Sequence, residues 1–258
     1  MLEFIHNGLR LEYEVTGNGF PFVFLHGMGG SINQIYSVYE PLEGVRLITM
    51  NQQGHGNSDA DWEAFDFDHL GDDIVALLDH LNIQKAYFAG ISMGAAVSLN
   101  VAVRYPMRVE KLLLIRNAWT DHPMPEEVQT AYRDLGLTLK EGGIEAFYKT
   151  EGWEIISATS SVYTKKAFIS AFEDPRSIKN WQKYLLLPKK TPIPSADVLK
   201  QLTMPVCILA NRNDLCHPFI YSEYLKEHIR DAKLQEIPDK DYDKAGHKLK
   251  INQAINEL

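Results

Sequence analysis

Short apolar runs recur along the chain and alternate with amphipathic segments. Runs of this length with almost no polar residue are typical of strands buried on both faces of a sheet. They are Phe20–His26, Val45–Met50, Ala86–Ala89, Leu112–Ile115 and Val206–Ala210. Ahead of them, apolar and polar residues alternate around Asn7-Gly8, a pair that favours a tight hairpin turn. The chain is therefore expected to begin with a β-hairpin and to continue into a buried sheet.

The segments between the apolar runs have helical periodicity. The clearest is residues 68–81, where Leu70, Ile74 and Leu77 recur at helical spacing and acidic residues stand at the start. Buried strands that alternate with amphipathic helices imply parallel βαβ units. The pattern predicts an α/β fold whose sheet is covered by helices on both faces.

This alternation stops between about Trp119 and Leu202. The stretch is rich in aromatic residues and lysine, and it contains helical patches but no convincing strand; the patches are Glu126–Leu135, Ile144–Tyr148 and Thr164–Phe172. Lys189–Pro194 then predicts an extended return to the sheet, because a residue that precedes proline disfavours helix. We expect a core formed by residues 1–118 and 203–258, with residues 119–202 as a helical cap inserted into it.

Composition narrows the class of protein. The chain has 258 residues, 45% hydrophobic and 23% charged, which suits one globular domain, and no apolar run approaches the ~20 residues of a membrane span. Its start lacks the basic and apolar segments of a signal peptide, so a cytoplasmic location with Cys207 and Cys216 as free thiols is expected. The net charge of -8, without any Lys or Arg cluster, argues against a nucleic-acid partner.

The main candidate for chemistry is Gly90-Ile91-Ser92-Met93-Gly94. It directly follows the strand AYFA and directly precedes the helical pattern AAVSLNVAVRY. A G-x-S-x-G nucleophile elbow requires this order of strand, sharp turn and helix, and Gly90 and Gly94 let backbone segments approach closely while the serine is held out. The alternative is a chance Gly-Ser-Gly turn. The flanking strand and helix favour Ser92 as a nucleophile.

A serine nucleophile needs a histidine base, and that histidine needs an acid behind it. In the fold with this elbow the chain order is Ser, Asp, His. Asp214 follows the strand PVCILA in the loop Asn211–Pro218, at a strand end where active-site groups collect. An ordinary turn or helix-capping role is the alternative for Asp214.

Nine histidines compete for the role of base. His247, preceded by Gly246, follows the last strand candidate, Lys233–Ile237, and precedes the final helical pattern. His217 is close to Asp214 but lies on the wrong side of that strand. His26 and His55 stand in glycine-flanked loops, where a structural hydrogen bond is expected. The others, at surface or helix-face positions, are His6, His69, His80, His122 and His228. The predicted triad is Ser92, Asp214 and His247.

Acyl transfer also needs two donors for the tetrahedral oxyanion. The Met93 amide follows the nucleophile, and the Met28 amide lies in the loop His26-Gly27-Met28-Gly29-Gly30 after a buried strand. These two N–H groups are the predicted oxyanion hole, with His26 and Gly27 as supporting residues. No His-x-x-x-His or Cys-x-x-Cys pair is present, so we expect neither a metal nor another cofactor.

Together these motifs resemble the α/β-hydrolase superfamily, especially its small cap-bearing esterases, enol-lactonases and C–C hydrolases. The resemblance implies an eight-stranded, mostly parallel sheet with a helical cap inserted after strand six, and a two-step mechanism through an acyl-enzyme. The loop after strand four departs from the usual pattern, because Asn51 and Gln53 stand where Asp and Arg are usual. We expect altered anchoring of that loop rather than lost catalysis.

The expected function is cleavage of a small carboxylic ester, thioester or lactone with an apolar acyl part. The same triad also serves C–C bond hydrolysis, cofactor-free peroxidation and non-catalytic ligand receptors, so these alternatives stay open. Aromatic residues of the cap either wall the pocket or form the cap's own core; they are Trp119, Tyr132, Phe147, Tyr148, Trp153 and Trp181. The sequence does not separate a monomer from a homodimer. Dehalogenase and epoxide-hydrolase chemistry is disfavoured, because these enzymes need a carboxylate where this chain has Ser92.

Overall fold

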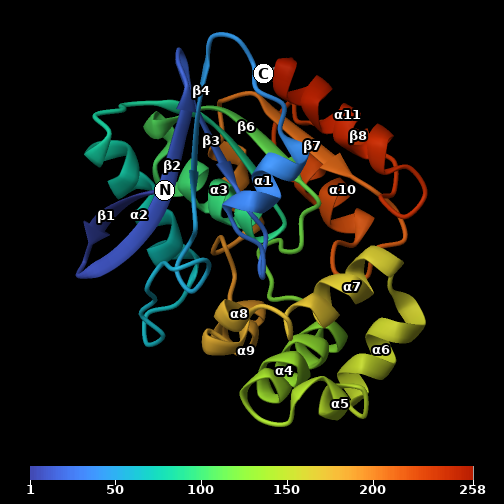
Figure 1. The fold of residues 1–258 in the computed structure, drawn as a ribbon. Coiled ribbons are helices and arrows are strands. Elements are labelled where there is room, and N and C mark those ends of the chain that lie inside the picture. Colours follow the sequence, from blue (N-terminus) through green and yellow to red (C-terminus); the bar gives the residue numbers. More distant parts are fainter. Residues whose placement is uncertain (258) are drawn as a thin grey trace.

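The computed structural model describes residues 1–257, which form one eight-stranded sheet with helices on both sides (Figure 1). The strands are β1 (Leu2–His6), β2 (Leu9–Gly17), β3 (Phe20–Leu25), β4 (Val45–Met50), β5 (Ala86–Ile91), β6 (Val109–Ile115), β7 (Val206–Ala210) and β8 (Lys233–Glu236). Their order across the sheet is β1-β2-β4-β3-β5-β6-β7-β8. Only the β1–β2 and β2–β4 pairs are antiparallel. The predicted mostly parallel, eight-stranded sheet is confirmed.

The helices between the strands are mostly those that the periodicity indicates. Those of the core are α1 (Ile32–Val38), α2 (Phe67–His80), α3 (Met93–Arg104), α10 (Phe219–His228) and α11 (Lys244–Asn256), with a short 3₁₀ turn, η1 (Pro106–Arg108). The hairpin turn also forms as predicted. Asn7 and Gly8 both have positive φ, 49° and 81°, which matches the right-handed twist of the flanking strands.

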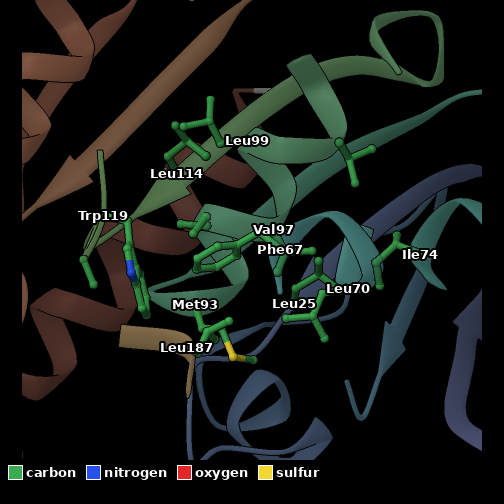
Figure 2. Packing of buried hydrophobic residues seen from close by; sticks show 14 of the residues in the cluster. Leu25, Phe67, Leu70, Ile74, Met93, Val97, Leu99, Leu114, Trp119 and Leu187 are labelled. Carbon is green, nitrogen blue, oxygen red and sulfur yellow. The ribbon is translucent and has the colours of Figure 1, made fainter. Parts of the chain in front are cut away.

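Alternate residues of the central strands point to opposite faces of the sheet and pack into two separate hydrophobic clusters. Phe22 and Phe24 of β3 belong to the cluster that Ile35 of α1 and Ile251 of α11 complete on one face. On the other face, Leu25 of β3 packs with Met93 and Val97 of α3 and with Leu70 and Ile74 of α2 (Figure 2). Each fully buried side chain of this size contributes ~1.5–3 kcal/mol relative to an exposed one. The two layers therefore fix the strand ends on which the site is built.

Residues between β6 and β7 form the predicted helical insertion, which gathers at one end of the sheet (Figure 1). It consists of α4 (Glu126–Lys140), α5 (Gly143–Phe147), α6 (Glu151–Thr159), α7 (Val162–Ser170), α8 (Pro175–Lys179), α9 (Gln182–Leu186), η2 (Leu187–Lys189) and η3 (Ala196–Gln201). The predicted patches correspond to α4, α5 and α7. The helix α6 was missed, since its run EGWEIISAT has too few turns to show a clear period.

The insertion is packed continuously onto the core. The ring of Trp119 lies 5.1 Å from that of Phe67 in α2, and Leu187 belongs to the same buried cluster (Figure 2). Lys183 of α9 is fully buried and donates from Nζ to the carbonyl of Gly54 at 3.0 Å. One hydrophobic cluster contains residues of both the core and the insertion. The boundaries of the predicted cap, residues 119 and 202, stay a prediction.

Within residues 1–257, no helix combines the length and the apolar character needed to cross a bilayer.

Candidate active site

Ser92 sits at a strained turn between β5 and α3. Its φ of 56° and ψ of -113° are unusual for a residue other than glycine, and its N–H donates to the carbonyl of Ile115 at 2.9 Å. A Cβ added at Gly90 would lie 2.0 Å from the Gly94 carbonyl oxygen, and one at Gly94 would lie 2.3 Å from that of Leu25. Both positions therefore require glycine, and the G-x-S-x-G motif forms the elbow that the sequence predicts.

Asp214 and His217 lie on one loop, between β7 and α10. The loop turns tightly, since the His217 N–H donates to the Asp214 carbonyl at 3.3 Å. This turn folds the imidazole back over the carboxylate, and Nδ1 of His217 lies 2.9 Å from Oδ2 of Asp214. The Asp214 side chain is almost fully buried, at 2% exposed. His217, only three positions after Asp214, is therefore the hydrogen-bond partner of its carboxylate.

The other ring nitrogen of His217 reaches the serine. Nε2 of His217 lies 2.8 Å from Oγ of Ser92. If Nδ1 carries the ring proton and donates a hydrogen bond to Asp214, Nε2 has a free lone pair that can accept the hydroxyl proton of Ser92. Ser92, His217 and Asp214 thus form a continuous hydrogen-bonded series with the geometry of a nucleophile, a base and an orienting acid.

Burial and charge set the protonation states in this series. Burial raises the pKa of the Asp214 carboxyl, but the neighbouring His217 and the Arg116 guanidinium outweigh it and hold that pKa well below its usual range. Burial lowers the pKa of His217, Asp214 opposes this shift, and Arg116 adds to it, so the pKa falls below its ordinary value. At neutral pH the acid is ionised and the imidazole is neutral, as a general base requires.

Arg116 is a member of the site that the sequence analysis missed. It directly follows β6 with a φ of 52°, and its N–H donates to the Leu209 carbonyl at 2.7 Å. Its Nη2 forms an ion pair with Asp214 and lies 3.2 Å from Nδ1 of His217. A charged residue directly after the apolar run LLLI, at the carboxyl end of a strand, was the available signal.

The predicted base, His247, is not hydrogen-bonded to Ser92 among residues 1–257. The sequence argument placed it before the final helix, but α11 begins earlier, at Lys244, because Asp243 caps it by accepting from the Gly246 N–H at 2.7 Å. His247 therefore lies in the first turn, where Nδ1 is 2.7 Å from the Pro238 carbonyl. Nε2 of His247 is buried without a partner among residues 1–257. Burial lowers the pKa of His247 to about 4.

The structure thus pairs Ser92 and Asp214 with His217, which the sequence argument had set aside. Chain order does not reveal the loop turn that brings His217 back over Asp214. The base role of His247 stays a prediction, and the observed hydrogen bonds favour His217 for that role.

The two loops that carry the predicted oxyanion donors flank the serine. A Cβ added at Gly27 would lie 3.3 Å from Cβ of Ser92, so this loop passes directly beside the nucleophile. Gln34 holds the loop by accepting from the Gly27 N–H at 2.7 Å. Met28 lines the cavity in front of Ser92, and Met93 begins α3. The positions of both residues are compatible with the predicted roles of their amides.

His26 and His55 have the structural hydrogen bonds that their loops predict. Nδ1 of His26 lies 2.8 Å from the Gly27 carbonyl, and its Nε2 accepts from the Gln52 N–H at 3.1 Å. Nε2 of His55 accepts from the Gly29 N–H at 3.1 Å. Burial lowers the pKa of His26 to about 4, so it stays neutral. These rings join the loops after β3 and β4, and neither is available as a base.

The two amides that replace usual charged residues anchor the loop after β4. Asn51 accepts from the Ile32 N–H at 2.9 Å and donates to Glu12 Oε2 at 2.8 Å. Gln53 donates to Asp73 Oδ2 at 2.7 Å. Each amide is thus hydrogen-bonded within the protein, and its effect relative to the usual charged residue stays a prediction.

A cavity of about 490 Å³ opens in front of Ser92 and His217. The loop after β3, Arg116 and the insertion helices α4 and α7 form its walls. Of the cap aromatics singled out in the sequence, Tyr132 lines the cavity, whereas Phe147 and Trp153 pack against each other with ring centroids 5.7 Å apart. Both cysteines are free thiols, as predicted, and Cys216 contributes to the cavity wall.

Comparisons with known proteins agree with the fold and the elbow. The family described as alpha/beta hydrolase fold matches residues 21–140, the segment that holds the loop after β3 and Ser92. That match covers a little under half of the chain, and the order of the strands across the sheet agrees with the α/β-hydrolase fold. The likeness to solved structures extends over almost the whole chain, since the match with one of them covers 99% of it.

Proteins of similar sequence differ in how much of the chain they match. The AB hydrolase superfamily protein YisY of Bacillus subtilis (strain 168) is 27% identical over 277 residues, covering 97% of this chain and 95% of that protein. The dihydrolipoyllysine-residue acetyltransferase component of the acetoin cleaving system of Pseudomonas putida is 44% identical over 108 residues, which is 41% of this chain. The chain spans 29% of the length of that component.

Among solved structures, the enol-lactonase from Burkholderia xenovorans LB400 superposes with a TM-score of 0.80. It is 18% identical, and the match covers 99% of this chain and 98% of that one. At this identity the likeness concerns the α/β-hydrolase fold alone.

Proposed function

We propose that this α/β hydrolase is a serine hydrolase that cleaves a small carboxylic ester, thioester or lactone through an acyl-enzyme. One observation carries the proposal: Nε2 of His217 lies 2.8 Å from Oγ of Ser92 while Nδ1 faces the buried Asp214 carboxylate. A serine hydroxyl is a poor nucleophile at neutral pH unless such a base removes its proton. The strained elbow and the adjoining cavity support the same role for Ser92.

In the first step, Oγ of Ser92 attacks the carbonyl carbon and its proton passes to Nε2 of His217. Asp214 stabilises the resulting imidazolium through Nδ1 and stays ionised. The carbonyl oxygen becomes an oxyanion, for which the amides of Met28 and Met93 are the proposed donors, each worth ~3–4 kcal/mol in related sites. Collapse of this intermediate breaks the bond to the leaving group, which takes the proton from His217.

In the second step, water replaces the leaving group. His217, neutral again, removes a proton from the water as it attacks the acyl-enzyme carbonyl. Collapse of the second tetrahedral intermediate returns the proton to Oγ of Ser92 and releases the acid. The sequence of steps uses only side chains and amides of this chain, together with water.

The cavity supports a small substrate with an apolar portion. Its volume of about 490 Å³ lies within the range of small-molecule sites, and Leu135 and Phe168 of the insertion contribute apolar surface. The enol-lactonase and the esterases among the structural neighbours have the same fold. Ester and lactone carbonyls are therefore the substrates to test first.

The direct test is hydrolysis of 4-nitrophenyl acetate, butyrate and octanoate by the wild type and by Ser92→Ala. We expect the wild type to turn over and the variant to lose at least about 10³-fold in kcat/KM, because removal of the nucleophile leaves only binding and oxyanion stabilisation. Thermal melting of both proteins controls for folding. The order of kcat/KM among the three esters measures the length of acyl chain that the cavity accepts.

Two results would overturn the ester-hydrolase proposal. If a folded wild type is inert on all three esters, then C–C bond hydrolysis or ligand reception becomes the leading explanation of the cavity. If Ser92→Ala keeps the wild-type rate, the hydrolysis does not pass through this serine.

A further inference from the structure

Arg116 has a larger capacity for hydrogen bonds than the site uses. Its side chain is 7% exposed; Nη2 forms the ion pair with Asp214 and lies 3.2 Å from Nδ1 of His217, whose own proton is directed at Asp214. Within residues 1–257, Nε of Arg116 is buried without a partner. A guanidinium carries five N–H donors, and a buried donor without a partner lowers stability. Such a group in a functional cavity requires an explanation.

The guanidinium faces the same cavity as the nucleophile. Arg116, Ser92 and His217 all line it, so Arg116 is separated from Oγ of Ser92 by one imidazole ring. A group bound to Arg116 would therefore lie a short distance from a carbonyl that Ser92 attacks.

The cavity is electropositive although the protein is acidic overall. The chain carries a net charge of -8, but within residues 1–257 no Asp or Glu lines this cavity, whereas Arg116 and Lys166 do. Lys240 adds part of a positive charge nearby, since burial lowers its pKa to about 7. Its Nζ lies 4.3 Å from the centroid of the Tyr163 ring, the same ring that lies 5.8 Å from Arg116. Asp214 offsets only part of this charge. A cavity lined by one sign of charge attracts the opposite sign.

We propose that Arg116 is a specificity-determining residue that binds a carboxylate of the substrate, so that the enzyme acts on esters or lactones bearing a carboxylate near the scissile carbonyl. The inference rests on the proposed function and names its substrate class. Arginine suits this role because its planar donors match the oxygens of a carboxylate. The apolar residues Leu135 and Phe168 then contact the uncharged part of the substrate.

A purely structural role for Arg116, as the partner that keeps Asp214 ionised, predicts a different behaviour. In that case removal of Arg116 would slow charged and neutral substrates equally, because both need the same acid and base. Carboxylate recognition instead changes the ratio between the two substrates. The ratio of kcat/KM values separates the two roles, since a general loss of catalysis cancels in it.

The experiment compares mono(4-nitrophenyl) glutarate with its neutral methyl ester, and 4-acetoxybenzoate with its methyl ester, after subtraction of spontaneous hydrolysis. The first pair places the carboxylate in the acyl part and the second pair places it in the leaving group. We expect the wild type to favour the anionic member of at least one pair by about tenfold or more. In Arg116→Met that preference falls about 10- to 100-fold, as expected for a charge-assisted hydrogen bond.

Two neighbouring lysines of α7 provide a matched control. Lys166 lines the cavity and Lys165 does not. Lys166→Met is expected to lower the preference for the anionic ester a few-fold by reducing the positive charge of the cavity, whereas Lys165→Met leaves it unchanged. Arg116→Lys keeps the charge but loses the planar donors, so we expect it to retain only part of the preference.

A binding measurement keeps the test valid if Arg116→Met folds poorly. Glutarate should inhibit the wild type competitively on a neutral ester at least tenfold more strongly than glutaramide. The inference is overturned if the wild type hydrolyses neutral esters without any preference for the anionic partners, a result that leaves the serine-hydrolase proposal intact. An unchanged preference in folded Arg116→Met also overturns it. If the protein binds glutarate through Arg116 but hydrolyses none of the esters, the carboxylate site is supported and the proposed ester hydrolysis is wrong.

Discussion

His217 follows Asp214 by three residues, and its Nδ1 lies 2.9 Å from Oδ2 of that carboxylate. The acid and the proposed base therefore share the loop between β7 and α10. Their mutual orientation depends on one local turn and not on the docking of α11, which carries His247.

The acid limb of the pH–rate profile should report His217. Only its neutral form accepts the proton of Ser92, so kcat/KM on a neutral ester should fall as pH drops through the pKa of His217, which burial lowers from its ordinary value. Arg116 lowers this pKa by disfavouring the protonated ring. Arg116→Met should therefore move the acid limb to higher pH, and a limb that stays in place would contradict this electrostatic coupling.

Gly94→Ala should disrupt the elbow. The added Cβ would lie 2.3 Å from the Leu25 carbonyl oxygen, a backbone atom that cannot move aside without shifting β3. We expect a loss of about 1–3 kcal/mol of stability, as for other overpacked sites, together with a large fall in activity. Ala95→Gly, one residue along α3, is the control and should cost about 0.5–1 kcal/mol. Equal melting temperatures for Gly94→Ala and the wild type would refute the steric argument.

Asn51→Ala should weaken the fold more than the chemistry. The substitution leaves the buried Ile32 N–H and Glu12 without their amide partner, which costs about 1–3 kcal/mol. Because Asn51 does not touch Ser92 or His217, kcat/KM of the folded protein should stay within a few-fold of the wild type. The exposed Gln253→Ala is a suitable control, with an expected change within about 0.5 kcal/mol. A variant that melts normally but is inactive would show that this loop acts on catalysis directly.

Lys183 should make stability depend on pH. Burial lowers its pKa to about 7 in the folded protein, below the value near 10.5 that it has in the unfolded chain. Between these two values the unfolded chain binds the proton more strongly, so this lysine's contribution to stability increases as pH rises from about 7 to 10. Below about pH 7 it is protonated in both states, and the cost of burying its charge is fully present.

Lys183→Met removes that cost, so the variant should be about 1–2 kcal/mol more stable than the wild type at pH 6.5, and the difference should shrink toward pH 9.5. Thermal melts across this range measure it, with the exposed Lys179→Met as control. A difference that is constant with pH would mean that Lys183 keeps an ordinary pKa in the fold.

Much of the fold was predictable because its signals are local. Apolar runs marked β3 to β7, and the small residues at Gly90 and Gly94 marked the elbow, since close backbone contact there leaves room for nothing larger. The base was not predictable in the same way. Chain order favoured His247, whereas the turn that directs His217 toward Ser92 depends on the conformation of a short loop. Arg116 escaped notice because its importance depends on the register of β6 beside β7.

The central claim is that His217 activates Ser92, and paired histidine variants test it most directly. We would measure kcat/KM for His217→Ala and His247→Ala on the best neutral ester, with thermal melts to confirm folding. The account predicts a loss of about 10³-fold or more for His217→Ala and less than about tenfold for His247→Ala. The opposite result, with His247→Ala inactive and His217→Ala close to wild type, would contradict the proposed site and restore His247 as the base.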